Sequence, residues 1–365
     1  MILEKTQILK VSDTLSESDD REKLLFAADI LKRGGLVAFP TETVYGLGGN
    51  ALDPDAATKI FAAKGRPSDN PPIVHISSPE DAENIAYTNE TYYKLAKAFM
   101  PGPLTVVLPK KDIVPDSVTG GIKTVAVRCP SHPVARELIR VAKVPIAAPS
   151  ANLSGSPSPT TADYVMRDMD GRIEMIIDGG QSEIGVESTV VSLTGEVCTV
   201  LRPGDIIPRE LYEVVGEVAV AEAVKVPSAA GDNPESPGMK YKHYAPETQL
   251  ILLSGEREDI ISYVNNEKRK KAVLSYSEDT EKYTDAYVID IGSVDDPKKQ
   301  MHNLFKALRD VEKADADIIY ANLPPENDDY LALYNRMIRA CGGEVVPCLP
   351  FEEGGLLAVD EESTF

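Results

Sequence analysis

The sequence of 365 residues lacks the features of several large classes of protein. It contains no run of about 18 apolar residues, the length that a transmembrane helix requires. Its first twenty residues carry acidic side chains early and have no apolar core followed by a small-residue cleavage site, so they do not look like a secretory signal. We therefore expect a cytoplasmic protein with no membrane partner.

Cysteine is scarce, and the four present are scattered through the chain. They form no Cys-x-x-Cys pair of the kind that binds zinc, and a reducing compartment argues against disulfide bridges. No acidic cluster with the spacing of metal ligands is visible either. The sequence therefore predicts no metal site made by the protein itself.

Positive charge is also in short supply, with 38 Lys and Arg against 58 Asp and Glu and a net charge of −20. From residue 247 to the end there are 25 acidic and 13 basic residues, and the preceding part is acidic as well. A surface that binds nucleic acid normally shows a basic excess. The charge therefore argues against stable nucleic-acid binding, although an acidic protein can still contain a local basic cleft.

The most informative stretch runs from Gly34 to His75. It opens with a short apolar strand, Leu36–Phe39, and continues into a loop of hydroxyl, acidic and glycine residues, Thr41–Gly49. A second strand is expected at Ile73–Ile76. Neither G-x-x-x-x-G-K-[ST] nor G-x-G-x-x-G occurs here, so the two common nucleotide fingerprints are absent.

A helix is expected between these strands, over Asp55–Lys64. Asp53 and the proline after it are favoured at the N-cap and the first helical position, and Gly65 is favoured at the C-terminal end. Lys64 ends this helix and Arg66 follows in a proline-rich loop. Two cations so placed suit a polyanion such as a triphosphate. A basic pair at a helix end can equally do no more than offset the helix dipole.

Two later strands also end in polar groups. The strand Thr124–Arg128 ends in an arginine that could hold a carboxylate with two hydrogen bonds, or could pair with a structural acid. The strand Val144–Ala148 runs into a hydroxyl-rich loop, residues 149–158, which suits an anion or a nucleotide but is also an ordinary capped loop. His132 is expected to cap a helix rather than to act in catalysis.

Three motifs occur in one order along the chain: Phe39-Pro-Thr-Glu-Thr-Val-Tyr-Gly-Leu-Gly48, Lys64-Gly-Arg66-Pro and Pro149-Ser-Ala-Asn152. With them the chain resembles the YrdC-like family, in its two-domain form, the threonylcarbamoyl-adenylate synthases. The resemblance implies an α/β fold with a YrdC-like twisted mixed sheet and helices, plus a smaller C-terminal Rossmann-like α/β domain.

The resemblance and the composition together predict three parts. Residues 1–218 would form the catalytic domain, 219–246 a linker that closes over the active site as a lid, and 247–365 an accessory domain. Alternating strand and helix patterns beyond residue 246 independently indicate a small α/β domain with a mostly parallel sheet.

The activity that the resemblance implies consumes L-threonine, bicarbonate and ATP and releases threonylcarbamoyl-adenylate and pyrophosphate. A separate enzyme would then transfer the threonylcarbamoyl group to tRNA. Mg²⁺ would accompany ATP and bridge its phosphate oxygens. Such a phosphoryl transfer needs positioning and charge neutralisation more than a covalent nucleophile, and the motifs are accordingly rich in Lys, Arg, Ser and Thr.

The resemblance also implies roles for individual residues. Lys64 and Arg66 would stabilise the transition-state charge. L-Threonine would be bound by Thr41, His75, Arg128, Ala148 and Ser188, with Arg128 on the carboxylate. ATP would be bound by Lys64, Ser68, Thr124, Ser150, Asn152, Ser158, Arg202 and Tyr241.

Two other functions remain open from the sequence. Similar domains in hydrogenase-maturation proteins adenylate carbamoyl groups for another acceptor, but those proteins carry zinc fingers that this chain has no cysteine pairs to build. YrdC-like domains have also been linked to double-stranded RNA, which would make the chain a non-enzymatic binding module.

Overall fold

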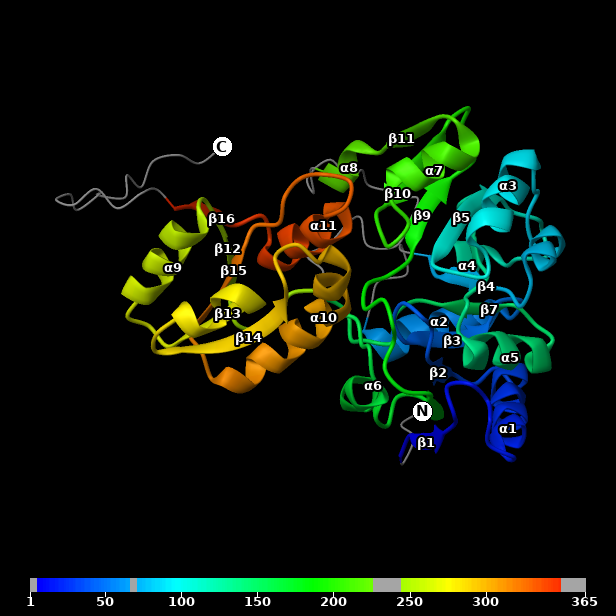
Figure 1. Cartoon of the computed structure of the whole chain (residues 1–365). Helices are drawn as coiled ribbons and strands as arrows, with labels where there is room; N and C mark the ends of the chain where they lie inside the picture. Colours follow the sequence, from blue (N-terminus) through cyan, green and yellow to red (C-terminus); the bar gives the residue numbers. More distant parts are fainter. Residues whose placement is uncertain (1–4, 66–70, 226–243, 349–365) are drawn as a thin grey trace.

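The chain folds into two lobes, each built around its own β-sheet (Figure 1). The computed structural model describes residues 5–65, 71–225 and 244–348. The N-terminal lobe holds an eleven-stranded mixed sheet, and the C-terminal lobe holds a five-stranded parallel sheet. Within the described ranges, no helix has the length and apolar character needed to cross a membrane.

The strands of the N-terminal lobe are short and largely buried, and they lie in the order β1-β8-β2-β3-β7-β4-β6-β5-β9-β10-β11. Parallel and antiparallel pairs alternate irregularly, as expected for a mixed sheet. Their bounds are β1 (Gln7–Lys10), β2 (Val37–Phe39), β3 (Gly46–Asn50), β4 (Ile73–His75), β5 (Leu104–Pro109), β6 (Thr124–Arg128), β7 (Ile146–Ala148), β8 (Met175–Asp178), β9 (Thr189–Ser192), β10 (Cys198–Arg202) and β11 (Val218–Val220).

The helices of this lobe cover the sheet, and the one that carries Lys64 forms as predicted. The Asp53 carboxylate accepts a hydrogen bond from the Asp55 amide at 2.9 Å, and Gly65 adopts φ of 62° at the other end. The helices are α1 (Asp20–Lys32), α2 (Pro54–Lys64), α3 (Glu90–Phe99), α4 (Asp116–Thr119), α5 (Pro133–Ala142), α6 (Ala162–Met169), α7 (Pro208–Val215) and α8 (Glu222–Lys225), with a 3₁₀ helix, η1 (Pro79–Asn84).

The expectation of a continuous loop over Thr41–Gly49 is wrong at its end, because Gly46–Asn50 forms strand β3. The strand pairs with β2 on one side and β7 on the other. A Cβ atom on Gly48 would lie 2.8 Å from side-chain atoms of both Phe39 and Ile146. The glycine pattern therefore serves a strand that lies close beneath two large side chains, rather than a flexible loop.

The C-terminal lobe confirms the expected alternation of strands and helices. Its sheet has the order β14-β13-β15-β12-β16, and every pair is parallel. Its last strand was not anticipated. The elements are β12 (Leu250–Ser254), α9 (Arg257–Asn266), β13 (Lys271–Tyr276), η3 (Ser277–Lys282), β14 (Ala286–Gly292), α10 (Pro297–Asp310), η4 (Val311–Ala314), β15 (Ile318–Asn322), α11 (Leu331–Cys341) and β16 (Val345–Pro347).

The segment expected to be a linker begins with regular structure instead. Residue 219 falls inside β11, which pairs in parallel with β10, and α8 follows directly. The alternation of small apolar and acidic residues there is too short to be read as a strand from the sequence alone. Residues 226–243 of the expected linker and lid, which spans 219–246, lie outside the described residues.

The two lobes meet along α10 and α11, which face the N-terminal lobe (Figure 1). Arg309 of α10 forms an ion pair with Asp168 at 2.7 Å and also donates to the Pro157 carbonyl. One continuous hydrophobic cluster joins Val44 of the N-terminal lobe to α10 and α11, through Tyr244 stacked on Phe305. Polar and apolar contacts therefore fix the lobes against each other.

Candidate active site

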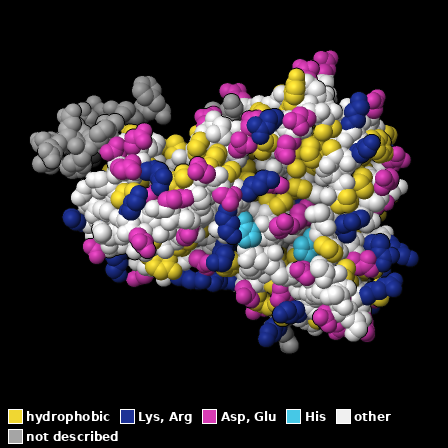
Figure 2. Space-filling view, in the orientation of Figure 1, with side chains coloured by type: hydrophobic (Ala, Val, Ile, Leu, Met, Phe, Trp, Pro, Cys, Tyr) yellow, Lys and Arg dark blue, Asp and Glu magenta, His cyan; other side chains and the backbone are white. Residues whose placement is uncertain are grey.

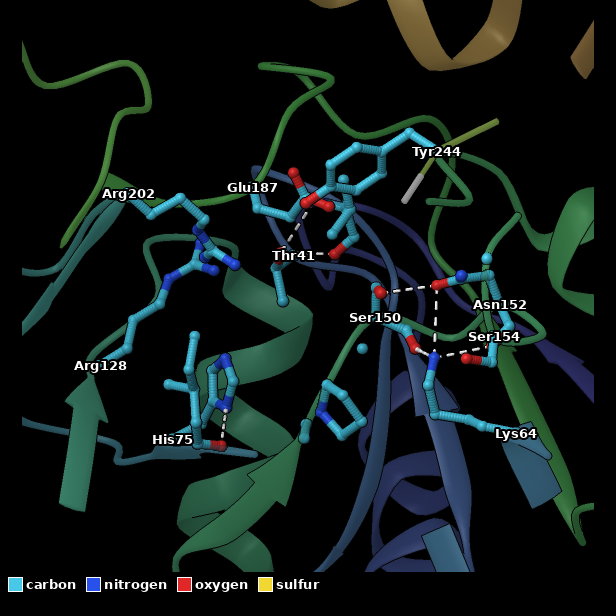
Figure 3. A pocket seen from close by; sticks show the side chains of 16 residues that line it. Thr41, Lys64, His75, Arg128, Ser150, Asn152, Ser154, Glu187, Arg202 and Tyr244 are labelled. Atoms are coloured by element: carbon cyan, nitrogen blue, oxygen red, sulfur yellow. Dashed lines mark hydrogen bonds between the residues drawn. The ribbon is translucent and has the colours of Figure 1, made fainter. Parts of the chain in front are cut away.

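A polar cavity lies in the N-terminal lobe beside the boundary with the C-terminal lobe (Figure 3). Its empty space is about 690 Å³, which includes the open solvent at its mouth. Strand ends and the loops that follow them supply most of its walls. The lining residues are Thr41, Val44, Gly46, Lys64, Ile73, His75, Arg128, Ala148, Pro149, Ser150, Asn152, Ser154, Gly155, Glu187, Arg202 and Tyr244.

Lys64 reaches the cavity from the last turn of α2 and is almost fully buried. Its ammonium donates to the main-chain carbonyls of Ser150 and Asn152, the latter at 2.7 Å, and lies 3.3 Å from the Asn152 side-chain oxygen. The main-chain carbonyl of Lys64 accepts a hydrogen bond from the Ser154 amide. The second and third motifs are thus bound to each other, which holds the cationic head at one wall of the cavity.

The loop after β7 is ordered by its own side chains. Ser150 donates its hydroxyl proton to the Asn152 side-chain oxygen, and the Asn152 amide nitrogen donates to the carbonyls of Leu153 and Ser156 at 2.7 and 2.9 Å. Because the asparagine bridges both ends of the turn, the Ser150 hydroxyl is presented to the cavity on a fixed backbone.

Arg128 ends β6 on the opposite wall, as the sequence predicts, and it pairs with a structural acid, while its role in holding a substrate carboxylate stays a prediction. Its guanidinium lines the cavity and also pairs with the buried Glu42 carboxylate at 2.7 Å. Burial alone would raise the pKa of Glu42, but the Arg128 charge holds that pKa below its usual value. The pair therefore stays ionised and orients the arginine.

His75 lies beneath Arg128 on β4 and is uncharged at neutral pH. Burial, and next the Arg128 charge, lower the pKa of His75 to about 3. Its Nδ1 lies 3.1 Å from the Ile73 carbonyl and its ring meets Phe39 edge to face. A neutral imidazole so held adds shape and a hydrogen-bonding nitrogen to the cavity, but no charge.

Thr41 sits between these walls in the turn that follows β2. Its hydroxyl donates to the Val44 carbonyl at 2.6 Å and accepts from the amides of Thr43 and Val44. The hydroxyl therefore shapes the turn and presents its remaining surface to the cavity.

Glu187 and Arg202 form a third group beside Tyr244 (Figure 3). The Arg202 guanidinium donates to the carbonyl and the hydroxyl of Ser188, both at 3.1 Å, and that hydroxyl also contacts Thr105 at 2.8 Å. Glu187 accepts from the Ser158 hydroxyl at 2.6 Å. Ser158 and Ser188 thus support cavity residues from behind.

The charges in the cavity oppose those of the protein as a whole. Three cationic side chains, Lys64, Arg128 and Arg202, line the described part of it, against one carboxylate, Glu187. Figure 2 shows acidic and basic groups interspersed over the outer face, without a continuous basic stripe. Positive charge is concentrated inside the cavity, which favours a small anion over an extended nucleic acid.

The structure brings most of the predicted site residues together. Eight of them line the cavity, and Ser158 and Ser188 lie directly behind it. Thr124 begins β6 at the end opposite Arg128 and is not among the lining residues. Arg66, Ser68 and Tyr241 lie outside the described residues. The eight predicted residues that line the cavity are Thr41, Lys64, His75, Arg128, Ala148, Ser150, Asn152 and Arg202.

Sequence reasoning missed Glu187 and Tyr244 in the lining and Glu42 behind it. Glu42 lies inside the first motif, between two threonines of a turn, so its position was a usable signal. Glu187 directly precedes Ser188, a predicted ligand. Tyr244 lies in the aromatic and basic run Lys240–Pro246 of the sequence, which was a signal for a role near a ligand, and it packs against Phe305 of the C-terminal lobe.

The fold and the site together define an α/β protein with a cationic small-molecule cavity at the edge of a mixed sheet. A family model described as telomere recombination matches residues 29–204, and a model described as the C-terminal domain of threonylcarbamoyl-AMP synthase matches residues 206–342. The chain belongs to the threonylcarbamoyl-AMP synthase family.

Relatives that match nearly the whole chain support this family assignment. The threonylcarbamoyl-AMP synthase of Pyrococcus abyssi is 45% identical over 352 residues, covering 93% of this chain and 99% of that protein. The Bacillus subtilis enzyme of the same name is 43% identical, covering 94% and 99%. The crystal structure of P. abyssi Sua5 complexed with L-threonine matches with a TM-score of 0.85 at 44% identity, covering 94% of this chain and 99% of that one.

Proposed function

We propose that the cavity is the active site at which this chain converts L-threonine, bicarbonate and ATP into threonylcarbamoyl-adenylate and pyrophosphate. Its family makes the chain an enzyme, a nucleotidyltransferase that forms L-threonylcarbamoyladenylate. The observation that carries the assignment to this cavity is the set of three cations around it in a protein of net charge −20.

The two walls suit different parts of the substrates. Arg128 would hold the threonine carboxylate, with the cavity residues Thr41, His75 and Ala148 also on the threonine side and Ser188 behind. Lys64, Ser150, Asn152 and Arg202 would contact ATP, with Ser158 behind. Thr124, Ser68 and Tyr241 remain predicted ATP ligands.

The chemistry divides into two steps. The threonine amine first takes up the carbon of bicarbonate, which releases water and leaves a carbamate. A carbamate oxygen then attacks the α-phosphorus of ATP, so one P–O bond forms while the bond to the departing pyrophosphate breaks. We propose that Lys64, which lines the cavity, offsets charge on the reacting phosphates, and that Arg66 has the same role.

The neutral state of His75 bears on how threonine would be held. A charged imidazolium could only donate hydrogen bonds, whereas a neutral ring can also accept one. Burial keeps the imidazole neutral, since the pKa of His75 is lowered to about 3. We propose that this neutral ring packs against the bound threonine and adds no charge beside Arg128.

A divalent cation would enter with the nucleotide rather than bind the protein first. No group of three metal-ligating side chains occurs among the described residues, and the one carboxylate lining the cavity is already engaged by hydrogen-bond donors. Mg²⁺ bound to ATP would supply further neutralisation of the phosphate charge. We also propose that the adenylate passes to a separate tRNA-modifying transferase.

Pyrophosphate release from ATP tests the assignment. The purified chain is supplied with ATP and Mg²⁺, with and without L-threonine and bicarbonate, and release should require both. Lys64→Met should lower the rate about 10²- to 10³-fold. Lys97→Gln, an exposed lysine on α3, is the matched control and should leave the rate unchanged.

Two outcomes would contradict the proposal. Release that does not depend on threonine would indicate a different acceptor or a simple ATPase. A folded Lys64→Met variant with full activity, checked by circular dichroism, would remove the cavity from the reaction.

A further inference from the structure

Arg336 belongs to the C-terminal lobe but lies against the cavity of the N-terminal lobe. It projects from α11 and is completely buried. Its Nε lies 2.9 Å from a carboxylate oxygen of Glu187, and its Nη2 donates to the Pro203 carbonyl at 2.9 Å. Its Nη1 donates to the side chain of neighbouring Asn335, and the guanidinium lies over the Tyr244 ring. Every polar end of this arginine is thus engaged at the lobe boundary.

Its partner Glu187 is the carboxylate that lines the cavity. The other carboxylate oxygen accepts from Ser158. Burial alone would raise the pKa of Glu187, but the charges of Arg336 and then Arg202 lower it to about 2. Glu187 is therefore ionised, and Arg336 supplies the charge that offsets it from outside the N-terminal lobe.

Arg336 also holds the two chain segments on either side of Arg202. Pro203, whose carbonyl it binds, directly follows Arg202. Ser188, which directly follows Glu187, accepts from the Arg202 guanidinium through both its carbonyl and its hydroxyl. The segments are packed tightly, since a Cβ on Gly204 would lie 2.4 Å from the Thr189 amide nitrogen. One side chain of the C-terminal lobe therefore fixes both anchors of a cavity arginine.

We propose that Arg336 is a positioning residue for the nucleotide end of the cavity. It neutralises Glu187 and holds Arg202 in place, so that the C-terminal lobe completes the binding site for the ATP phosphates. The inference rests on the proposed function in one respect, namely that the polyphosphate binds beside Lys64 and Arg202. It assigns the C-terminal lobe a part in substrate binding rather than a purely structural one.

An unpaired Glu187 would act against a polyphosphate. Without Arg336, the groups nearest to the Glu187 carboxylate would be Arg202 and Tyr244. Arg339 of α11 and Arg128 would be the next charged groups around them. Its pKa would rise toward the range that burial favours, so that it would be protonated at low pH and ionised at high pH. ATP binding in such a variant should weaken as the pH rises.

The experiment uses steady-state kinetics of the full-length chain, with pyrophosphate release as the readout. Arg336→Met should raise KM for ATP at least tenfold at pH 8, with a smaller change at pH 6 and less than a threefold change in KM for L-threonine. Glu187→Gln in the same chain should recover most of the loss, because it removes the opposing charge. Arg336→Lys should fall between the wild type and Arg336→Met.

Arg309→Met is the matched control. Arg309 is also a buried arginine of the C-terminal lobe that pairs with an acid of the other lobe, but neither it nor Asp168 lines the cavity. Its loss should lower the melting temperature while KM for ATP changes less than twofold. If Arg336→Met does not fold, Arg336→Lys still tests the proposal, because it keeps the charge but loses the bond to the Pro203 carbonyl, so KM for ATP should rise while KM for L-threonine changes less than threefold.

The results separate the two proposals. A wild-type chain without threonine-dependent pyrophosphate release would overturn the proposed function. An active wild type would instead overturn the role of Arg336 in any of three cases: equal effects of Arg336→Met and Arg309→Met on KM, no recovery in the double variant, or, where Arg336→Met does not fold, an unchanged KM for ATP in Arg336→Lys.

Discussion

The two walls of the cavity are stabilised in different ways. The inner wall, made by Thr41, Lys64, His75, Arg128, Ser150 and Asn152, is held by hydrogen bonds within the N-terminal lobe. The boundary wall, made by Glu187, Arg202 and Tyr244, depends on α10 and α11 of the C-terminal lobe. Each wall contains one buried ion pair, Arg128–Glu42 in the first and Arg336–Glu187 in the second.

The two ion pairs differ in whether their partners come from the same lobe or from different lobes. At the inner wall, both members of the ion pair come from one lobe, and the acid is not among the cavity-lining residues. At the boundary wall, the acid lines the cavity and the base arrives from the other lobe. We therefore expect substitutions in the inner wall to change stability and threonine binding together, and those at the boundary wall to act chiefly on the nucleotide.

The largest expected effect on stability is that of Arg128→Met. The change leaves Glu42, which is 4% exposed, buried without its partner. Loss of one member of such a pair costs about 3–5 kcal/mol, so the free energy of unfolding in urea should fall by that amount. The double variant Arg128→Met/Glu42→Gln should regain most of this stability but not threonine-dependent activity. A single variant as stable as the wild type would show that the pair contributes nothing to the inner wall.

His75 should give the next largest effect, and only in acid. Its folded-state pKa of about 3 lies below the ordinary value of 6.5, so the unfolded chain binds a proton that the folded chain excludes. The stability that results is complete above pH 6.5 and is lost as the pH falls toward 3, by about 1.4 kcal/mol per pH unit. Between pH 6.5 and 5, the wild type should lose about 2 kcal/mol more than His75→Gln in urea unfolding. Equal losses would mean that the imidazole is not excluded from water.

The smallest effect is expected at the exposed edge of the boundary. Arg209 pairs with Asp329 at 3.3 Å across the lobes, but both side chains are more than half exposed. Ion pairs of this kind contribute about 0–1 kcal/mol and are screened by salt. Arg209→Ala should therefore change neither the melting temperature by more than a few degrees nor KM for ATP. A large effect would show that contact between the lobes matters at any point, and not specifically at Glu187.

The inner wall was largely predictable because its signals are local. The strand that ends in Arg128 was predicted over its full length, and the Asp53 and Gly65 caps defined the helix that carries Lys64. The resemblance implied which residues of this wall belong to the site. The hydrogen bonds between Lys64 and Asn152 show why the second and third motifs occur together.

The boundary wall was predictable only in part, because it is made by residues far apart in the sequence. Arg202 and Ser188 followed from the resemblance, but Arg336 lies in α11, within the strand and helix patterns beyond residue 246, where the sequence singled out no functional residue. Its pairing with Glu187 spans 149 positions, and nothing near either residue signals the other. The strand at Gly46–Asn50 was missed for a related reason. Glycine is needed there because the side chains of Phe39 and Ile146, on other strands, pack closely against it.

The first motif also divides its side chains between two hydrophobic cores. Tyr45 packs in the core of the N-terminal lobe, whereas its neighbour Val44 belongs to the cluster formed with α10 and α11. Adjacent positions of one short turn are therefore under selection from two different packing partners. A change that improves one core displaces the backbone of the other, so the two lobes must evolve as a pair. Exchanging the C-terminal lobe for that of a distant relative would leave Val44 facing a surface to which it was never fitted.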